Sequence, residues 1–380
     1  MDSLQHQIAL MLVPQVGAVT AKTLVSYCGS AEAVFRASKR ELHKIPGIGP
    51  TTIAALVAAV EPLTRAEREI SFMEKHEVQA IFYTDARYPA RLRQCQDSPA
   101  MFFFKGSSVA IFESPRVVAI VGTRQPSEHG KALCEEIVEG FSAYNVLIVS
   151  GLAFGVDVTA HRKASALGIP NVGVLGHGLG SIYPSQHRSV AQRMIENGGL
   201  VSEYAHDAKP DREHFPMRNR IISGLSDVVL VVETANSGGS MITVQCAERH
   251  GREIFAVPGR PNDAKSVGCN YLLKNERAKL AESAADIALR MQWDEPSYAP
   301  ARQGSAGGRA SAGKQAHLFL DLNEAETALV GIIRDKPEIP IDQLALAAQF
   351  TPGILASHIL SLEFKGLIRT LPGKRYVVSG

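Results

Sequence analysis

The chain has 380 residues, 45% of them hydrophobic, which is enough for about two or three domains with substantial cores. A formal net charge of +2 carries no global signal for nucleic acid, so any basic surface must be local. Five scattered cysteines without a C-x-x-C pair are typical of a reduced cytosolic protein and argue against a zinc site. Because no apolar run reaches about 18 residues, we expect a cytoplasmic protein that binds no metal and spans no membrane.

Two related glycine turns lie in residues 1–64. Val13-Pro14-Gln15-Val16-Gly17 and Ile45-Pro46-Gly47-Ile48-Gly49 match at an offset of 32 residues, each between two apolar helical patterns. This repeat predicts a helical domain of helix-hairpin-helix (SAM-like) type. Such a turn either presents N–H groups to a DNA phosphate or only packs two helices, and Lys22 and Lys44 are its nearest cations. The sequence leaves both interpretations open.

Residues 65–293 follow the pattern of an α/β domain. An amphipathic helix from Arg65 to Lys75 leads into apolar runs at 81–83 and 101–104, interpreted as an edge strand and a cover for the next elements. Strands and helices then alternate, which predicts βαβ crossovers and a mostly parallel sheet. Helix starts are expected near Ser127 and Thr243. The predicted strands are 117–121, 146–150, 171–175, 199–202, 227–233 and 254–257.

The C-terminal part of the chain changes composition. Residues 294–317 are poor in large apolar side chains and are predicted to form a flexible linker. In residues 318–380 we expect a helix after Asn323, helices at 341–348 and 352–365, and a hairpin at 368–378. Three helices and a hairpin predict a winged-helix domain. The sequence leaves open whether this domain contacts DNA, another protein or neither.

Small residues follow the predicted strands. Gly122-Thr123-Arg124 follows the strand 117–121, and Ser150-Gly151 ends the next one. Because parallel strands end at one edge of a sheet, these turns are expected to form a shallow groove whose N–H groups face an anion. Arg124 adds a guanidinium that can fork onto phosphate oxygens. The groove is completed by Gly176-His177-Gly178, Arg218-Asn219-Arg220 and Gly238-Gly239-Ser240.

Each of these features also has a structural interpretation. Glycine turns are ordinary in α/β folds, and Arg218 or Arg220 is free to pair with Glu203 instead. His161 is interpreted as a structural histidine, because no nucleophile elbow or metal-ligand spacing accompanies it.

Several longer motifs occur in a familiar order. They are Val121-Gly-Thr-Arg-Gln-Pro-Ser-Glu-His-Gly130, Val149-Ser-Gly-Leu-Ala-Phe-Gly-Val-Asp157, Ala160-His161, Ile182-Tyr-Pro184, Ser202-Glu-Tyr204, Phe215-Pro-Met-Arg-Asn-Arg-Ile-Ile222, Phe255-Ala-Val-Pro-Gly259 and Gly268-Cys-Asn270. With them the chain resembles the DNA processing protein A (DprA/Smf) family, bacterial proteins of natural transformation that bind single-stranded DNA.

The resemblance implies an extended Rossmann-like sheet with helices on both faces at 65–293, between a helix-hairpin-helix domain (1–64) and, after the linker, a winged helix (318–380). It implies a homodimer without catalytic activity or cofactor that protects incoming single-stranded DNA and loads the recombinase RecA onto it. By position, Arg124 would hold a backbone phosphate and Gly122, Ser150 and Gly151 would leave room for the strand. Thr123, Arg218, Asn219, Arg220 and Ser240 would complete the site.

Two positions depart from the family pattern. Phe154 stands where the family usually has an arginine, which removes a cation and provides an aromatic ring that either stacks on a base or packs inward. Gly238-Gly239 replaces a Ser-Gly turn, which keeps close backbone approach but removes a hydroxyl.

Three other functions are alternatives to this one. A nucleoside-phosphate phosphoribohydrolase needs a glutamate where Gln245 stands. A nicotinamide dehydrogenase needs a G-x-G-x-x-G turn, and Gly176-x-Gly178-x-Gly180 has the wrong spacing. A scaffold that binds only RecA is distinguished by whether DNA binds at all.

Overall fold

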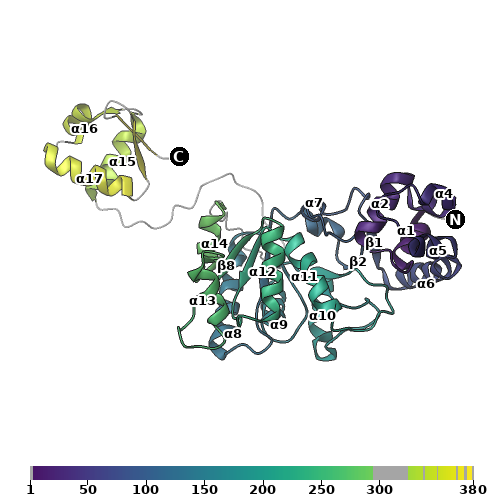
Figure 1. Cartoon of the computed structure of the whole chain (residues 1–380). Helices are drawn as coiled ribbons and strands as arrows, with labels where there is room; N and C mark the ends of the chain where they lie inside the picture. The colour runs from purple at the N-terminus through teal and green to yellow at the C-terminus, as the bar shows by residue number, and fades with distance from the viewer. Residues whose placement is uncertain are drawn as a thin grey trace, which may run out of the picture. The chain divides into compact units, whose positions relative to one another are not determined.

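The structure is a computed structural model that describes residues 3–293, 324–336, 339–348, 350–364, 367–371 and 375–378. The chain divides into two compact units, Met1–Pro300 and Ala301–Gly380 (Figure 1). The predicted linker at 294–317 lies outside the described residues. Within the described part, no helix has the length and apolar character needed to cross a membrane.

The N-terminal segment consists of helices, as the repeated glycine turns predict. The first turn joins α1 to α2 and the second joins α4 to α5, so both helical hairpins are confirmed. Gly47 has a φ of +78°, a left-handed conformation that favours glycine. The last helix begins at Val60, five residues before the predicted start at Arg65. The helices are α1 (Ser3–Leu12), α2 (Ala18–Cys28), α3 (Ala31–Arg36), α4 (Lys39–Leu42), α5 (Pro50–Val57) and α6 (Val60–His76).

A nine-stranded sheet forms the centre of the first unit, in the order β1-β2-β6-β5-β4-β3-β7-β8-β9. Strands β3 to β9 pair in parallel, whereas β2 pairs antiparallel with both β1 and β6. The interpretation of 101–104 as a cover is therefore wrong, since this run is a strand inside the sheet. The strands are β1 (Gln79–Phe82), β2 (Met101–Gly106), β3 (Arg116–Val121), β4 (Val146–Ser150), β5 (Asn171–Leu175), β6 (Gly198–Ser202), β7 (Val228–Val231), β8 (Glu253–Ala256) and β9 (Lys279–Leu280).

Helices cover both faces of this sheet, which confirms the predicted mostly parallel α/β fold. Val117, Ala119 and Val121 of β3 pack with α11, α12 and α13, while Val118 and Ile120 pack with α8, α9 and α14 on the other face. The helices are α7 (Ala90–Arg93), α8 (Glu128–Gly140), α9 (Val156–Ala166), α10 (Arg188–Glu196), α11 (His214–Leu225), α12 (Gly239–Arg249), α13 (Val267–Lys274) and α14 (Ala284–Arg290), with short 3-10 turns at Val109–Glu113, Phe141–Ala143 and Ser185–His187.

One of the two predicted helix starts is correct. Ser127 caps α8, and its hydroxyl accepts a hydrogen bond from the Gly130 N–H at 2.9 Å. Thr243, in contrast, is buried inside α12, which already begins after Gly238. The small residues before it form a tight turn in which the Gly238 N–H bonds the Ala235 carbonyl, so the helix starts one turn earlier than predicted.

The N-terminal helices and the antiparallel strands share one hydrophobic core. Ile8, Leu10 and Ile53 of the helices belong to the same buried cluster as Phe82 of β1 and Phe103 of β2. The helical segment is thus packed onto one face of the sheet's antiparallel end, and the predicted boundary at residue 64 stays a prediction.

The second unit has the winged-helix arrangement that the sequence predicts. One short strand, β10, lies between the first and second of its three helices, and two more strands follow the third; together they form a small sheet in the order β10-β12-β11. The tip of the predicted hairpin, residues 372–374, lies outside the described residues. The elements are α15 (Glu324–Asp335), β10 (Ile339–Pro340), α16 (Ile341–Ala348), α17 (Pro352–Phe364), β11 (Ile368–Leu371) and β12 (Arg375–Val378).

Candidate nucleic-acid interface

The order of the parallel strands reverses at β3, since β4 to β6 lie on one side of it and β7 to β9 on the other. This reversal creates a crevice at the carboxyl edge of the sheet. β3 lies between β4 and β7, and its crossover helix α8 covers one face while α12, which follows β7, covers the other. The loops that leave β3 and β7 therefore diverge, as at the ligand-binding switch point of open α/β sheets. A cavity of about 720 Å³ opens there, and we call it the switch-point cavity. Nine predicted site residues line it: Gly122, Thr123, Arg124, Phe154, Arg218, Asn219, Gly238, Gly239 and Ser240.

The loop after β3 places one exposed arginine at this cavity. The Thr123 N–H donates to the Glu233 carbonyl at 2.6 Å, and a Cβ at Gly122 would lie 2.5 Å from Val156 Cγ2. The loop is therefore held close to the end of β7. Arg124 forms no ion pair with the described residues, and its Cζ lies 5.9 Å from the centre of the Phe215 ring. Its charge remains free to meet an anion.

A second arginine lies deeper in the same cavity. Arg218 on α11 is only 6% exposed, and its guanidinium packs against Gly151, where a Cβ would lie 1.9 Å from Nη2. Nη2 lies 3.6 Å from the Asp157 carboxylate, but within the described part of the chain Nε and Nη1 have no hydrogen-bond partner. Burial lowers the pKa of Arg218, with Asp157 opposing the shift, and an arginine still stays protonated at neutral pH. The cavity thus contains buried cationic donors that lack acceptors.

Aromatic rings lie around these two arginines. Phe154 is 46% exposed, with its ring edge-on to His187 at a centroid distance of 4.8 Å, so it is not packed inward. Tyr183 and Phe215 also line the cavity, with ring centroids 5.9 Å apart. The sequence interpretation did not include these two residues in the site. Phe215 precedes Arg218 by three residues on α11, and that helical spacing places both on one face.

Polar groups at the start of α12 already form hydrogen bonds within the protein. Ser240 Oγ donates to Thr234 Oγ1 at 2.6 Å, and the Asn219 amide donates to the Gly239 carbonyl at 3.4 Å. A Cβ at Gly238 would lie 2.4 Å from Thr234 Oγ1, so this turn needs glycine. The turn therefore contributes backbone and shape rather than free hydroxyl groups.

Three predicted site residues do not line the cavity. Ser150 is fully buried, and its hydroxyl donates to the Ile120 carbonyl at 2.5 Å. Gly151 lies behind the Arg218 guanidinium. Arg220 forms an ion pair with Glu203, which is the alternative that the sequence left open. Ser150 and Gly151 therefore lie behind the residues that line the cavity, and Arg220 belongs to the ion pair with Glu203.

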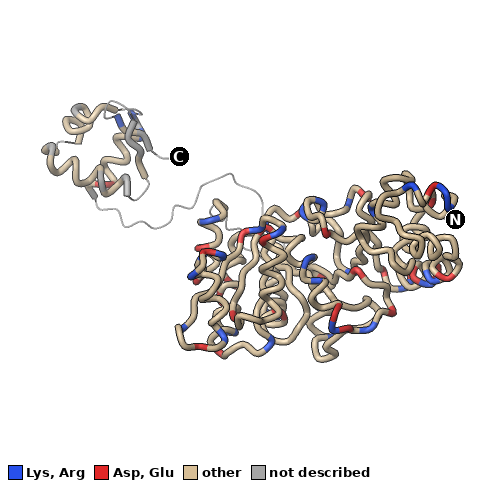
Figure 2. The backbone as a smooth tube through the Cα atoms, in the orientation of Figure 1, with Lys and Arg blue, Asp and Glu red and all other residues tan. Residues whose placement is uncertain are grey.

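Charge elsewhere on the chain is mixed rather than concentrated, as Figure 2 shows along the backbone tube. At the first helical hairpin, the Lys22 ammonium donates to the Ser98 carbonyl and hydroxyl, both at 2.7 Å. Lys44 at the second hairpin is exposed. One of the two cations considered for DNA contact is therefore already used in an internal contact. No cluster of three His, Cys, Asp or Glu side chains suited to a metal ion occurs within the described ranges.

His161 has the surroundings of a structural histidine. It is fully buried, with Nδ1 2.9 Å from Asn171 Oδ1 and Nε2 2.7 Å from the Gly151 carbonyl. Burial lowers its pKa below the ordinary value of 6.5, although the hydrogen bond to Gly151 opposes this shift. The folded state therefore keeps His161 neutral at a pH where the unfolded chain already binds a proton.

We expect this histidine to make the protein less stable in mild acid. Below about pH 6.5 the unfolded state takes up the proton first, so the unfolding free energy should fall by up to about 1.4 kcal/mol per pH unit until the folded pKa is reached. Urea unfolding of the wild type and of His161→Gln between pH 7.5 and 5 measures the difference. Equal pH dependence in the two proteins would contradict the assignment.

A mostly parallel sheet with a cationic, aromatic-lined cavity at its switch point defines an α/β protein built to bind an anionic ligand. The family model described as DNA recombination-mediator protein A matches residues 79–292. Models for a SAM-like helix-hairpin-helix tandem and for the DprA winged helix domain match residues 8–61 and 320–374. The chain belongs to the DNA recombination-mediator protein A family, also called DprA or Smf.

Individual relatives agree with this assignment. Protein Smf of Synechocystis is 29% identical over 396 aligned residues, which span 98% of both chains. The X-ray structure of DNA processing protein A from Streptococcus pneumoniae superposes with a TM-score of 0.65 at 29% identity, over 76% of this chain and 98% of that one. A Helicobacter pylori structure, described as showing a unique single-stranded DNA binding mode of DNA processing protein A, has a TM-score of 0.52 at 28% identity, over 58% and 97% of the two chains.

Proposed function

We propose that the protein binds single-stranded DNA in the switch-point cavity and acts as a recombination mediator without catalysing a reaction. In this role it protects incoming strands in the cytoplasm during natural transformation and loads RecA onto them as a homodimer. Family membership supports the mediator role, and the Helicobacter pylori relative is described as binding single-stranded DNA.

The observation that carries the proposal is the unsatisfied guanidinium of Arg218. Buried donors without acceptors are costly, and a phosphate or a base carbonyl would supply the missing acceptors for Nε and Nη1. Arg124 at the mouth adds a second, exposed cation for the same strand. Together the two arginines favour a ligand with negative charge along its length.

The aromatic rings favour a single strand over a duplex. Phe154 and Tyr183 are about half exposed at the cavity, and base stacking on such rings requires bases that are not already stacked in a double helix. Duplex DNA offers only its phosphates to this site. We therefore expect a clear preference for single strands.

The alternative of nucleotide cleavage gains no support from the geometry. Gln245, at the position where the phosphoribohydrolase pattern needs an acid, is an exposed residue of α12 and does not line the cavity. Release of ribose 5-phosphate from purine monophosphates would nevertheless rescue this alternative, and the assay is simple.

Fluorescence anisotropy with a labelled oligothymidine and the matching duplex tests the proposal directly. We expect tighter binding of the single strand, and faster nucleation of RecA filaments on strands preincubated with the protein. Sedimentation equilibrium tests the homodimer. Absence of single-strand binding by the intact chain would reject the central claim, whereas binding without an effect on RecA would reject only the loading step.

A further inference from the structure

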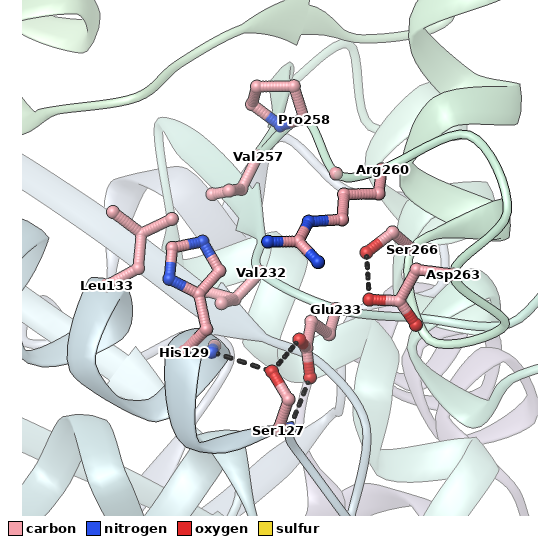
Figure 3. A pocket seen from close by; sticks show the side chains of 12 residues that line it. Ser127, His129, Leu133, Val232, Glu233, Val257, Pro258, Arg260, Asp263 and Ser266 are labelled. Atoms are coloured by element: carbon pink, nitrogen blue, oxygen red, sulfur yellow. Dashed lines mark hydrogen bonds between the residues drawn. The ribbon is translucent and has the colours of Figure 1, made fainter.

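A second cavity, of about 570 Å³, lies on the other side of the loop that follows β3 (Figure 3). Gly122 to Arg124 of this loop line the switch-point cavity. Ser127 at the end of the loop, with His129 and Gly130 in the first turn of α8, lines the second one. Val232 and Val257, which follow β7 and β8, form part of its apolar wall. We call it the β8 cavity.

A buried carboxylate lies at the β8 cavity without a cation. Glu233 is 5% exposed, and its oxygens accept from the Ser127 N–H at 2.8 Å and the Ser127 hydroxyl at 2.5 Å. No Lys, Arg or His among the described residues lies within ion-pair distance of it. A Cβ at Gly130 would lie 2.4 Å from Glu233 Cδ, so the first turn of α8 packs directly on the carboxylate. A carboxylate has about four acceptor positions, and two of these are used.

Two polar side chains lie across the cavity from this carboxylate. Figure 3 shows the Arg260 guanidinium and the His129 ring pointing toward the middle of the cavity, with Glu233 below Arg260. Within the described part of the chain, neither side chain forms an ion pair. Asp263, across from them, accepts from the Ser266 hydroxyl at 3.4 Å and the Lys265 N–H at 3.0 Å. The cavity thus offers free donors at its rim and a free acceptor at its floor.

We infer that the β8 cavity binds a nucleotide, with the phosphate on Arg260 and the amino group of the base on Glu233. A phosphate alone would meet repulsion from the buried carboxylate, and a cation would meet Arg260, so the ligand needs an anionic part and a donor part. Cytosine and adenine carry an exocyclic amino donor, and carboxylates accept from the cytosine amino group in known base readout. The His129 ring adds a surface on which a base stacks.

The position of the cavity favours the strand in the switch-point cavity as the source of this nucleotide. Arg124 and Ser127 lie three residues apart on one loop, so a strand that passes Arg124 reaches the β8 cavity next. This inference rests on the proposed function. A free nucleotide has the same chemistry and is separated by the experiment below.

The test compares wild type, Arg260→Ala and Arg124→Ala on oligo(dC) and oligo(dT) of roughly 4 to 16 nucleotides, the site sizes of single-strand-binding folds. Arg193→Ala is the matched control, because this exposed arginine lies near the C-terminal end of α10, beside the start of β6 at the opposite edge of the sheet. Arg260→Ala should bind the shortest strands normally and bind longer oligo(dC) about tenfold more weakly. Its salt slope on those strands should fall by roughly 0.7, as for one lost phosphate contact.

Each further outcome has one meaning. Equal affinities of Arg260→Ala and wild type at every length would overturn the inference and leave the proposed function intact. An equal loss on oligo(dT), whose base has no amino group, would reject the role of Glu233. Saturable binding of free dCMP that is lost in Arg260→Ala would support the site with a free nucleotide as ligand. No binding of any strand by the wild type would reject the proposed function instead.

Discussion

Replacing Arg218 with methionine is expected to lower both the stability of the protein and its affinity for single-stranded DNA. The Asp157 carboxylate would stay buried without its cation, and among the described residues the Ala153 N–H, at 3.3 Å, would be its remaining donor. Removing one partner of a buried pair costs about 3 kcal/mol, the lower end of the usual range because the pair is separated by 3.6 Å. Urea unfolding measures this loss.

The affinity loss has a separate origin, so a double variant separates the two effects. Loss of the unsatisfied Nε and Nη1 donors should weaken single-strand binding by roughly 10- to 100-fold. Adding Asp157→Asn removes the unpaired charge and should restore most of the stability without restoring DNA affinity. If the affinity returned together with the stability, Arg218 would be a structural residue and not a ligand of the strand.

Arg220→Met provides a matched control on the same helix. Arg220 is also a largely buried arginine, but its partner is Glu203 and it does not line the cavity. This variant should lose stability by a similar amount and keep its affinity for DNA. The pair of variants therefore distinguishes contact with the strand from general damage to α11.

Replacing Arg124 with alanine should weaken DNA binding while stability stays within about 0.5 kcal/mol of wild type. Arg124 is exposed and forms no ion pair with described residues, so its removal leaves no buried group unpaired. If roughly four phosphates are neutralised, wild-type affinity should fall about 50-fold between 50 and 200 mM salt. The variant should lose about 10- to 100-fold in affinity and roughly 0.7 in salt slope.

Anisotropy titrations at several salt concentrations measure both quantities, with Arg193→Ala as the control for loss of one surface charge. Lower affinity with an unchanged salt slope would mean that Arg124 does not contact a phosphate. A loss confined to duplex DNA would count against the switch-point cavity as the strand's site.

Local sequence patterns predicted most of the fold, because buried parallel strands and capped helices leave short-range signals. The antiparallel insertion of β2 between β1 and β6 was missed, since the pairing of Phe104 with Val201 joins residues far apart in the chain. Arg218 and Arg220 show a different limit. They are two residues apart on one helix, so their side chains are separated by about 200° around the helix axis. Only one of them is therefore able to face the cavity. Helical geometry would have separated them from the sequence alone.

The β8 cavity has no comparable sequence signal. His129 lies in the first turn of α8, whereas Glu233 and Arg260 lie in the segments that follow β7 and β8. The three meet only because β3, β7 and β8 are neighbours in the sheet. The order of parallel strands depends on long-range packing, so local patterns that predict the strands do not predict which strands are neighbours. The same reason kept Tyr183 out of the predicted groove.

The core shared by the N-terminal helices and the antiparallel strands limits how this chain can be rearranged in evolution. Phe82 and Phe103 contribute to a face that the helices keep away from water. A lineage that loses the helices must replace these side chains with polar ones, or it will expose an apolar surface that promotes association. Gain or loss of this segment is therefore coupled to substitutions in β1 and β2, whereas the winged-helix unit, with its separate core, is free of that coupling.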